Sequence, residues 1–382
     1  MRVKEDYDYS MNVGVDMHVL NGIYQGSRTY MLEIFSRVIP KCPNIKFYVF
    51  CSDEKSLLSL SPSFSHHNVV LVAGISKNPF FRLLLQLPYF QIKYRLSYFH
   101  VQYILPVFMF CKGVVSLHDI LFESHPQYFS KSFVFRSKIL MRWSALRAQK
   151  IFTISSFSKK EICSRYKVEP DKIDLVYCGV STTKYFSGND GLHYIEKRGI
   201  ASKGYILSVG RLDPRKNLIN MIQAYSLTSM KYPIVLVGQE GLGVSELYKL
   251  IDDLGINNKV FFIKDAEDSE LSALYRHANF FIFPSFAEGF GLPVLEAMAS
   301  GIPVITSNTT SLPEVAGDAG ILINPNNVED ISRSIDNILD SEQVTSTLVK
   351  KGFMQVEKFS WEVSSLKVSE FYKDMIHKLK NK

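Results

Sequence analysis

The sequence predicts an α/β protein with two doubly wound domains, each built on a parallel sheet that is covered by helices. Three observations support this class. The chain has 382 residues, which is long for a single hydrophobic core. Short apolar runs typical of strands alternate with stretches of helical periodicity. The hydrophobic content is 46% and the charged content 21%, as in ordinary globular proteins.

A stretch of weak periodicity divides the chain. Residues 181–203 are rich in Gly, Ser and charge, and βα units resume after them. We therefore expect an N-terminal domain over residues 1–180, a linker over 181–203, a C-terminal domain over 204–358 and a closing helix over 359–382.

The elements of the N-terminal domain follow from local patterns. A first strand at 11–17 leads through a loop with Gly22 and Gly26 to a helix at 28–39, for which Ser27 is the expected N-cap. Further strands are expected at 46–51, 68–73, 98–103, 113–117, 151–155 and 173–180. His118 and Asp119 follow one of these strands, at the sheet edge where ligands of open α/β sheets bind.

The second domain opens with SVGRLDPRKN (208–217). A strand at 205–209 ends at Gly210 and delivers Arg211 to the carboxyl edge of the sheet. Lys216 lies at the mouth of the next helix, with Asn217 as its expected cap. Both cations could reach a diphosphate, Arg211 through its planar fork and Lys216 as a point charge.

Residues 283–325 are the most informative stretch. Gly289 and Gly291 belong to a loop that leaves backbone N–H groups able to approach a ligand. Pro293 suits the first position of a short helix and Gly301 its C-terminal stop, and residues 303–307 follow as a buried strand. A glycine loop that runs into a helix N-terminus favours binding of an anion.

Two glutamates flank this loop, Glu288 before the helix and Glu296 within it. A phosphate would repel a carboxylate, whereas a sugar diol donates two good hydrogen bonds to one. The pattern therefore predicts a phosphate at the helix N-terminus with hydroxyl-bearing rings on either side. The alternative is an ordinary helix cap with Glu296 as a first-turn acid.

The segment from Phe283 to Pro325 resembles the donor-binding signature of the retaining GT-B glycosyltransferases of group 1, in which seven residues separate two glutamates. The resemblance covers nearly the whole chain and is most specific from Ser208 to Pro325. It implies two Rossmann-like domains that face each other across a cleft, the first binding the acceptor and the second the nucleotide sugar. The closing helix would cross back onto the first domain.

The resemblance also implies roles for individual residues. Glu288 would hold the donor sugar and Glu296 the ribose diol. The catalytic residues would be His118, Glu288, Arg211 and Lys216. Contacts to the donor would come from Gly26, Gly210, Gly289, Phe290, Gly291, Leu292 and Glu296.

The implied chemistry breaks a sugar–diphosphate bond. Fixed cations and helix-end amides would stabilise the departing phosphate, so we expect neither a metal nor a cofactor. The one D-x-D sequence, Asp6 and Asp8, lies near the N-terminus. We favour a front-face displacement in which the leaving phosphate accepts the acceptor's proton. Domain closure that joins His118 with Glu288 would gate turnover.

Two departures from the family pattern affect the donor assignment. The chain has GIYQGS where the family has a Gly-Gly-Ile-Gly turn, and Lys264 where the family has a glycine near the base. GDP-mannose is the preferred donor, with UDP-glucose or another UDP-hexose as the alternative. An alternative of another class is a sugar-nucleotide epimerase. A glycan phosphorylase would need a cofactor lysine site that we do not find, and the intact Glu288, Glu296, Arg211 and Lys216 disfavour a silent partner subunit.

Charge is divided unevenly between the domains. Residues 1–180 contain 23 Lys and Arg against 13 Asp and Glu. Within them, 79–99 intersperses Arg82, Lys93 and Arg95 with aromatic and aliphatic residues, which favours contact with anionic lipid. The alternative is a core helix with solvated arginines; a nucleic-acid surface is disfavoured because no binding motif accompanies the charge.

The remaining features concern the compartment. Five scattered cysteines without a C-x-x-C pair fit a reducing compartment, and the N-terminus has no apolar signal region. We expect a cytoplasmic enzyme, peripheral at the inner face of the cell membrane. Its acceptor would be a lipid-linked oligosaccharide in cell-surface polysaccharide synthesis, either O-antigen of lipopolysaccharide or capsule.

Overall fold

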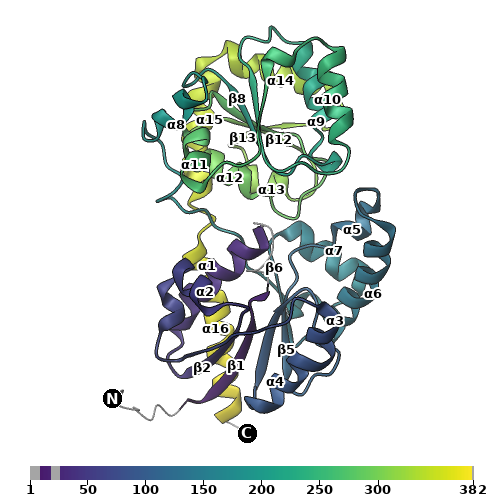
Figure 1. The fold of residues 1–382 in the computed structure, drawn as a ribbon, viewed down its shortest axis with the longest axis vertical. Coiled ribbons are helices and arrows are strands. Elements are labelled where there is room, and N and C mark those ends of the chain that lie inside the picture. Colours follow the sequence, from purple (N-terminus) through teal and green to yellow (C-terminus); the bar gives the residue numbers. More distant parts are fainter. Residues whose placement is uncertain (1–8, 19–25, 381–382) are drawn as a thin grey trace. The chain divides into compact units, whose positions relative to one another are not determined.

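The computed structural model describes residues 9–18 and 26–380, and the chain forms two compact units (Figure 1). The first unit is drawn from residues up to Ser124, from Phe129–Cys178 and from Trp361 onward. The second unit is drawn from His125–Tyr128 and Gly179–Ser360. Three residues considered in the sequence, Asp6, Asp8 and Gly22, lie outside the described residues.

The first unit contains a seven-stranded sheet in the order β3-β2-β1-β4-β5-β6-β7. Every strand pair in it is parallel. The strands are β1 (Met11–Asp16), β2 (Ile45–Phe50), β3 (Val69–Val72), β4 (Tyr98–Gln102), β5 (Lys112–Ser116), β6 (Lys150–Thr153) and β7 (Ile173–Leu175). The last strand is shorter than the expected 173–180.

Helical segments separate consecutive strands except between β4 and β5, in line with the helical patterns that the sequence shows between some of the strands. The helices are α1 (Gly26–Lys41), α2 (Glu54–Leu60), α3 (Pro79–Phe81), α4 (Leu87–Lys93), α5 (Leu121–Ser124), α6 (Lys131–Arg147), α7 (Ser156–Tyr166) and α16 (Trp361–Lys380). A π turn over Arg82–Gln86 joins α3 to α4. Ser27 lies inside α1, so its prediction as an N-cap is wrong.

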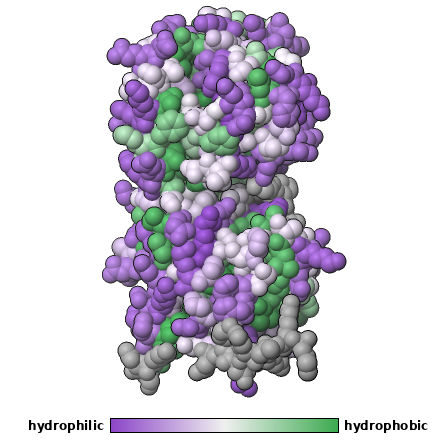
Figure 2. Space-filling view, turned by 90° about the vertical axis from the view of Figure 1, so that its left-hand side faces the viewer, coloured by the Kyte–Doolittle hydropathy of each residue, from purple (hydrophilic) through white to green (hydrophobic). Residues whose placement is uncertain are grey.

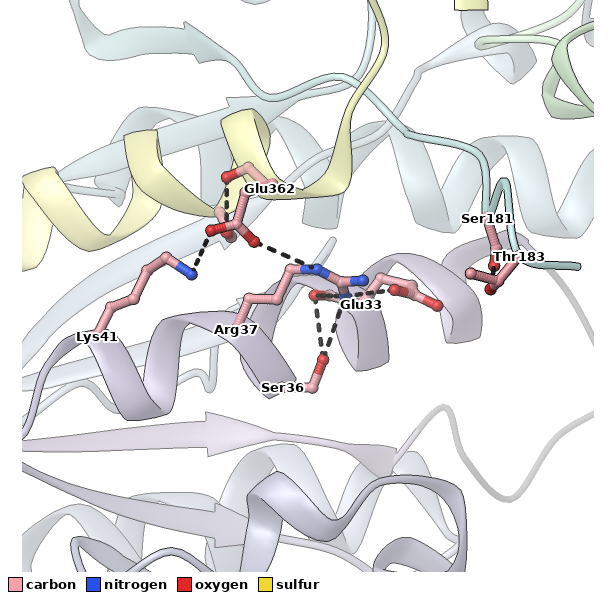
Figure 3. A network of polar contacts seen from close by, with 8 residues as sticks. Glu33, Ser36, Arg37, Lys41, Ser181, Thr183 and Glu362 are labelled. Carbon is pink, nitrogen blue, oxygen red and sulfur yellow. Dashed lines mark hydrogen bonds and ion pairs between the residues drawn. The ribbon is translucent and has the colours of Figure 1, made fainter. Parts of the chain in front are cut away.

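The C-terminal helix α16 belongs to the first unit, where it packs along α1. Figure 3 shows the polar contacts between these two helices. The Glu362 carboxylate lies 2.8 Å from Nζ of Lys41 and 3.8 Å from Nε of Arg37. Tyr372 of α16 is fully buried, and its hydroxyl lies 2.9 Å from Nδ1 of His100 on β4.

The second unit contains a six-stranded parallel sheet in the order β10-β9-β8-β11-β12-β13. Its strands are β8 (Ile206–Val209), β9 (Ile234–Val237), β10 (Val260–Ile263), β11 (Phe280–Phe283), β12 (Val304–Ser307) and β13 (Gly320–Ile323). Its helices are α8 (Leu192–Lys197), α9 (Leu218–Ser226), α10 (Val244–Asp253), α11 (Asp268–Arg276), α12 (Leu292–Ala299), α13 (Leu312–Ala316), α14 (Val328–Asp340) and α15 (Glu342–Val356).

The segment expected to be a linker contains helix α8 and packs against α11. Arg198 pairs with Glu270 of α11, and the guanidinium of Arg276 lies 4.0 Å from the ring centroid of Phe186. The helix has only six residues, too few for a periodic apolar pattern to reveal it.

Each sheet reverses its strand order once. The reversal lies between β1 and β4 in the first unit and between β8 and β11 in the second. In open α/β sheets the crevice outside the carboxyl ends of such strands is the place where ligands bind. Each unit therefore has one sheet edge at which a ligand-binding site is expected.

The surface of the units is mixed in character. Figure 2 shows one face, on which hydrophilic residues surround smaller apolar patches. Among the described residues, no helix is both long and apolar enough to cross a membrane.

Candidate active site

The loops that follow β8 and β11 meet at the strand reversal of the second unit. After β8 the chain passes Gly210 and forms a 3₁₀ turn at Pro214–Lys216. After β11 it forms the loop that leads into α12. Because β8 and β11 are neighbours in the sheet, the two loops place their side chains at the same edge.

Glu288 forms two ion pairs at this edge of the sheet. Its Oε1 lies 2.7 Å from Nζ of Lys216, and its Oε2 lies 2.8 Å from Nη1 of Arg215. Arg215 also donates from Nη1 to the carbonyl oxygen of Ala287 at 2.6 Å. The Lys216 ammonium lies 4.5 Å from the ring centroid of Phe283. Two cations and one carboxylate thus form a largely buried cluster, and the charge of Asp213 also acts on Lys216.

The cluster determines the charge state of Glu288. Burial alone would raise the pKa of its carboxyl, but the charges and hydrogen bonds of Arg215 and Lys216 lower it to about 2. Burial lowers the pKa of the Lys216 ammonium, and the ion pair with Glu288 opposes that effect. Each carboxylate oxygen keeps a second lone pair, so an ionised Glu288 can still accept a hydrogen bond from a sugar hydroxyl.

Gly210 and Gly291 have backbone conformations that side chains rarely adopt. The φ of Gly210 is +149°, and a Cβ there would lie 3.2 Å from Cε of Lys216. The φ of Gly291 is +110°, and a Cβ there would lie 2.6 Å from Cδ2 of Leu312. The local geometry therefore favours glycine at both positions. A side chain at position 210 would crowd Lys216, and one at position 291 would clash with Leu312 at the turn into α12.

The turn before α12 is held by two residues that sequence reasoning missed. Thr310 Oγ1 accepts the backbone N–H of Glu288 at 3.0 Å. Ser311 Oγ lies 2.8 Å from the carbonyl oxygens of both Glu288 and Phe290. These bonds fix the backbone that carries the predicted contacts from Gly289 to Leu292, the first residue of α12. No sequence signal marks Thr310 or Ser311, since they lie in a loop more than 20 residues away.

Glu296 lies on α12 and accepts a hydrogen bond of 2.9 Å from the hydroxyl of Tyr275. Burial raises the pKa of its carboxyl, while Tyr275 and the charge of Lys184 oppose this rise. Tyr275 was also not foreseen. It packs edge-on against Tyr185, with ring centroids 5.5 Å apart. The Glu296 carboxylate therefore lies beside an aromatic pair, an arrangement suited to binding a sugar ring that carries a diol.

The structure separates the two arginines of the 208–217 motif. Arg211 is exposed and has no ion pair among the described residues, whereas Arg215 contacts Glu288. Asn217 stands before α9 in a left-handed conformation but makes no capping bond with its side chain. Its Nδ2 instead donates to the carbonyl oxygens of Pro284 and Pro325 at 3.0 and 2.6 Å. Asn217 therefore occupies the predicted N-cap position of α9, but its side chain does not form a capping hydrogen bond.

The segment expected near the base has its own ion pair. Lys264 follows β10, and its Nζ lies 2.6 Å from Oε1 of Glu240. The Tyr248 hydroxyl donates to the same oxygen at 2.6 Å. The lysine at position 264 thus forms an ion pair with Glu240, which the glycine of the family pattern could not form.

His118 lies at the carboxyl edge of the first unit's sheet, two residues beyond β5. Its ring lies 4.5 Å from that of Tyr30 and 5.3 Å from that of Tyr103, measured between centroids. Burial lowers the pKa of His118 to about 3, so the imidazole is neutral at physiological pH. Its Nε2 is buried without a hydrogen-bond partner among the described residues.

Gly26 is the first residue of α1 in the described chain, and a Cβ there would meet nothing within 4 Å. Among residues 9–18 and 26–380, no group of three or more His, Cys, Asp or Glu side chains could hold a metal ion. The five cysteines, all described, are free thiols.

Comparison with known proteins identifies the family. Residues 193–354 match the family of glycosyl transferases group 1, and residues 44–184 match glycosyltransferase family 4. The O-antigen chain mannosyltransferase B of Escherichia coli is 35% identical over 268 residues, which cover 69% of this chain and 70% of that protein. The O-antigen chain mannosyltransferase RfbU of Salmonella typhimurium is 31% identical over 59% of this chain and 60% of its own length.

A solved structure agrees with the fold. HepE of Anabaena, in a crystal structure with UDP-glucose, is similar with a TM-score of 0.77 at 18% identity. The match covers 95% of this chain and all of that one. The predicted GT-B fold is confirmed by this similarity and by the two parallel sheets. The chain belongs to the group 1 glycosyltransferases and is a glycosyltransferase.

Proposed function

We propose that this enzyme transfers mannose from GDP-mannose to a lipid-linked glycan acceptor with retention of anomeric configuration. The observation that carries the proposal is the buried cluster of Glu288, Arg215 and Lys216 at the head of α12. Its cations would stabilise the departing diphosphate, which is usually the largest catalytic contribution. The choice of mannose rests on the similarity to O-antigen mannosyltransferases.

The roles of the cluster follow from its charges. Lys216 and Arg215, with Arg211 as a third cation earlier in the same loop, would face the diphosphate. Glu288 would accept hydrogen bonds from hydroxyls of the donor sugar, and Glu296 would do so from the ribose. These cations would stabilise negative charge on the leaving group, so we expect neither a metal ion nor a cofactor. The leaving phosphate would take the acceptor's proton.

A UDP-hexose is the second candidate donor. Lys264 stands where the family pattern has a glycine near the base, and the HepE structure was solved with UDP-glucose. Both donors carry the diphosphate that the cluster would contact, so the two candidates would use the same cations.

The test is a thermal-shift screen of the full chain against GDP, UDP, GDP-mannose and UDP-glucose, followed by transfer assays with the donor that binds. A ligand present at 100 times its Kd stabilises the folded state by about 2.7 kcal/mol. We expect a shift with GDP and GDP-mannose. A shift with UDP alone would replace the donor, and no shift with any of the four would refute the donor site.

The glycan acceptor is proposed to reside at an anionic membrane surface. Along 79–93 of the first unit, the side chains of Phe80, Leu85, Tyr89 and Ile92 are each more than half exposed. Lys93 stands among them, 5.6 Å from the ring centroid of Tyr89. Exposed aromatic and aliphatic groups with a basic neighbour suit the boundary between head groups and acyl chains. The enzyme would then work at the inner face of the cell membrane.

The expectation that Arg82 belongs to this basic surface is wrong. Arg82 is only 8% exposed, and its Nη1 donates to the carbonyl oxygen of Ser76 at 3.3 Å. It is therefore part of the interior of the first unit. Lys93 and Arg95 are the exposed cations of the segment.

A further inference from the structure

The segment that the sequence predicts as a linker contributes side chains to the surroundings of Glu296. Lys184 and Tyr185 belong to this segment, and both lie beside α11 of the second unit. Nζ of Lys184 lies 3.1 Å from Oδ1 of Asp268, the first residue of α11. Tyr185 is only 5% exposed, and its ring packs edge-on against Tyr275 of the same helix. The start of the segment is therefore packed into this unit.

Two residues at the end of α11 hold the same segment a little further on. Nε of Arg276 donates to the carbonyl oxygen of Phe186 at 3.1 Å, and its Nη1 donates to that of Asp190 at 2.5 Å. Nε2 of His277 lies 3.1 Å from the same carbonyl oxygen of Asp190. Because contacts to α11 precede and follow Tyr185, its ring has a defined place beside the helix.

Two tyrosine hydroxyls bind the carboxylate of Glu296. The Tyr275 hydroxyl donates to Oε2 at 2.9 Å, and Tyr275 is fully buried. A hydrogen bond from Tyr185 also lowers the pKa of the Glu296 carboxyl. A carboxylate has about four lone-pair sites, so two remain for a ligand. The two tyrosine bonds also fix a flexible side chain before a ligand arrives, which lowers the entropic cost of binding.

The partners of Glu296 differ in kind from those of Glu288. Glu288 is paired with two cations, whereas Glu296 receives hydrogen bonds from uncharged hydroxyl groups. The charges of Lys184 and Asp268 act in opposite directions on the pKa of Glu296. A carboxylate in these surroundings accepts hydrogen bonds from neutral hydroxyl groups and repels a phosphate.

We propose that Tyr185 and Tyr275 are positioning residues that hold Glu296 for two hydrogen bonds from the ribose diol of the donor. This inference rests on the proposed function, because it concerns the contact that Glu296 would make there. It adds the segment around Tyr185 to the donor site. Neither tyrosine needs to touch the ribose, since both act through Glu296.

The test compares the binding of GDP and UDP to the full chain with that of their 2′,3′-dideoxy forms, which lack the diol. Titration calorimetry gives each Kd. Two hydrogen bonds to a carboxylate, each worth about tenfold in Kd, predict that the parent protein prefers the ribose form by about 100-fold. Glu296→Ala should abolish this preference.

Tyr275→Phe and Tyr185→Phe each remove one hydroxyl group and keep the ring. Each variant should reduce the preference for the ribose form by roughly tenfold, because Glu296 loses one of the bonds that hold it. Affinity for the dideoxy forms should change by less than about twofold, because these ligands make no bond to Glu296. A role of the tyrosines in folding alone would instead weaken the binding of both forms equally.

Tyr205 offers a matched control, because it bonds to the same helix. It is fully buried, and its hydroxyl donates at 2.6 Å to the carbonyl oxygen of Leu274, the residue before Tyr275. Tyr205→Phe therefore removes a buried tyrosine hydroxyl from α11 without removing a bond to Glu296. It should leave the preference for the ribose form unchanged, even if it lowers the Tm.

The outcomes separate this inference from the proposed function. Failure of the parent protein to bind either nucleotide would refute the donor site and this inference with it. A parent protein without the preference, or an E296A variant that keeps it, would refute the ribose contact of Glu296 and therefore the role of the tyrosines.

A third result would refute the positioning role alone. If E296A loses the preference while Y275F and Y185F keep it, the ribose contact stands and the tyrosines do not position Glu296. A loss in Y205F equal to that in Y275F would have the same meaning, because the effect would then come from a general disturbance of α11.

Discussion

Glu288 and Lys216 form an ion pair of 2.7 Å although 72 residues separate them in the chain. The pair exists because β8 and β11 are adjacent strands whose loops leave the sheet at one edge. Arg215 is the second partner of Glu288. Ion pairs therefore join the loop after β8 to the loop after β11. Perturbing any of the three residues should therefore change both stability and catalysis.

The first prediction concerns acid stability. The pKa of Glu288 is lowered to about 2 from 4.5, so its stabilising effect is complete above about pH 4.5 and is lost as the pH falls toward 2. By linkage this amounts to roughly 3 kcal/mol. Glu288→Gln should lower the free energy of unfolding at pH 7 and flatten its dependence on pH between 4.5 and 2. Denaturant unfolding across this range measures both; equal slopes in the two proteins would contradict the assignment.

The second prediction concerns the two arginines of the loop after β8, Arg211 and Arg215. Arg215→Met removes a charged hydrogen bond to Glu288 and another to Ala287, and should cost about 2 kcal/mol of stability. It should also lower kcat by about 10²-fold, as losses of fixed charge-stabilising donors do. Arg211→Met should change stability by less than about 0.5 kcal/mol, because its side chain is exposed. It should still raise the donor KM, which steady-state kinetics would show.

The reverse pattern, with R211M unstable and R215M neutral, would mean that the loop adopts another arrangement in solution.

The sequence allowed the fold and the strand edges that carry Lys216 and Glu288 to be foreseen, because parallel βα units bring loops after neighbouring strands together. It did not reveal the ion pairs of Lys216 and Arg215 with Glu288, or that Arg211 takes no part in them. That choice depends on the 3₁₀ turn at Pro214–Lys216, whose direction no pattern encodes. The bond from Tyr275 to Glu296 was hidden for a related reason, since it joins two helices through side chains that resemble ordinary core residues in the sequence.

The third prediction concerns the turn into α12. Gly291→Ala would place a side chain at a φ of +110° and within 2.6 Å of Leu312. Backbone strain of this kind costs about 1–3 kcal/mol, and the shifted turn would also weaken donor binding. Gly26→Ala is the stability control, because a Cβ there meets nothing within 4 Å. Thermal unfolding of both variants should show a lower Tm for G291A only, and equal Tm values would count against a requirement for glycine at position 291.

The fourth prediction concerns the neutral state of His118. Burial lowers its pKa to about 3 from 6.5, so the folded protein resists a proton that the unfolded chain accepts. Stability from this residue is complete above about pH 6.5 and is lost as the pH falls toward 3. His118→Gln should reduce the pH dependence of unfolding between pH 4 and 6 by roughly 1.4 kcal/mol per pH unit.

The same variant should lose transfer activity if the imidazole contacts the donor sugar. His100 is a useful comparison, because burial also lowers its pKa to about 3 while Tyr372 and Ser116 occupy both its ring nitrogens. His100→Gln should show the stability effect with a smaller loss of kcat. Similar losses of kcat in the two variants would argue that His118 acts only through the fold.

The fifth prediction concerns the membrane surface. A variant with Phe80, Leu85 and Ile92 all changed to Ser should lose binding to phosphatidylglycerol vesicles, because these side chains are 67%, 59% and 58% exposed and available to lipid. Changing Lys93 and Arg95 to Gln should weaken binding by about 30-fold, since each basic residue contributes about 1 kcal/mol at an anionic surface.

The effect of the two basic residues should shrink as salt rises, and phosphatidylcholine vesicles should bind the parent protein more weakly. The control is Leu242→Ser in the second unit, whose side chain is 76% exposed but has no place in the proposed surface. Vesicle co-sedimentation measures all of these proteins, with circular dichroism as the test of folding. If L242S lost as much binding as the triple variant, the contact would be a general property of exposed apolar groups and the surface on 79–95 would lose its support.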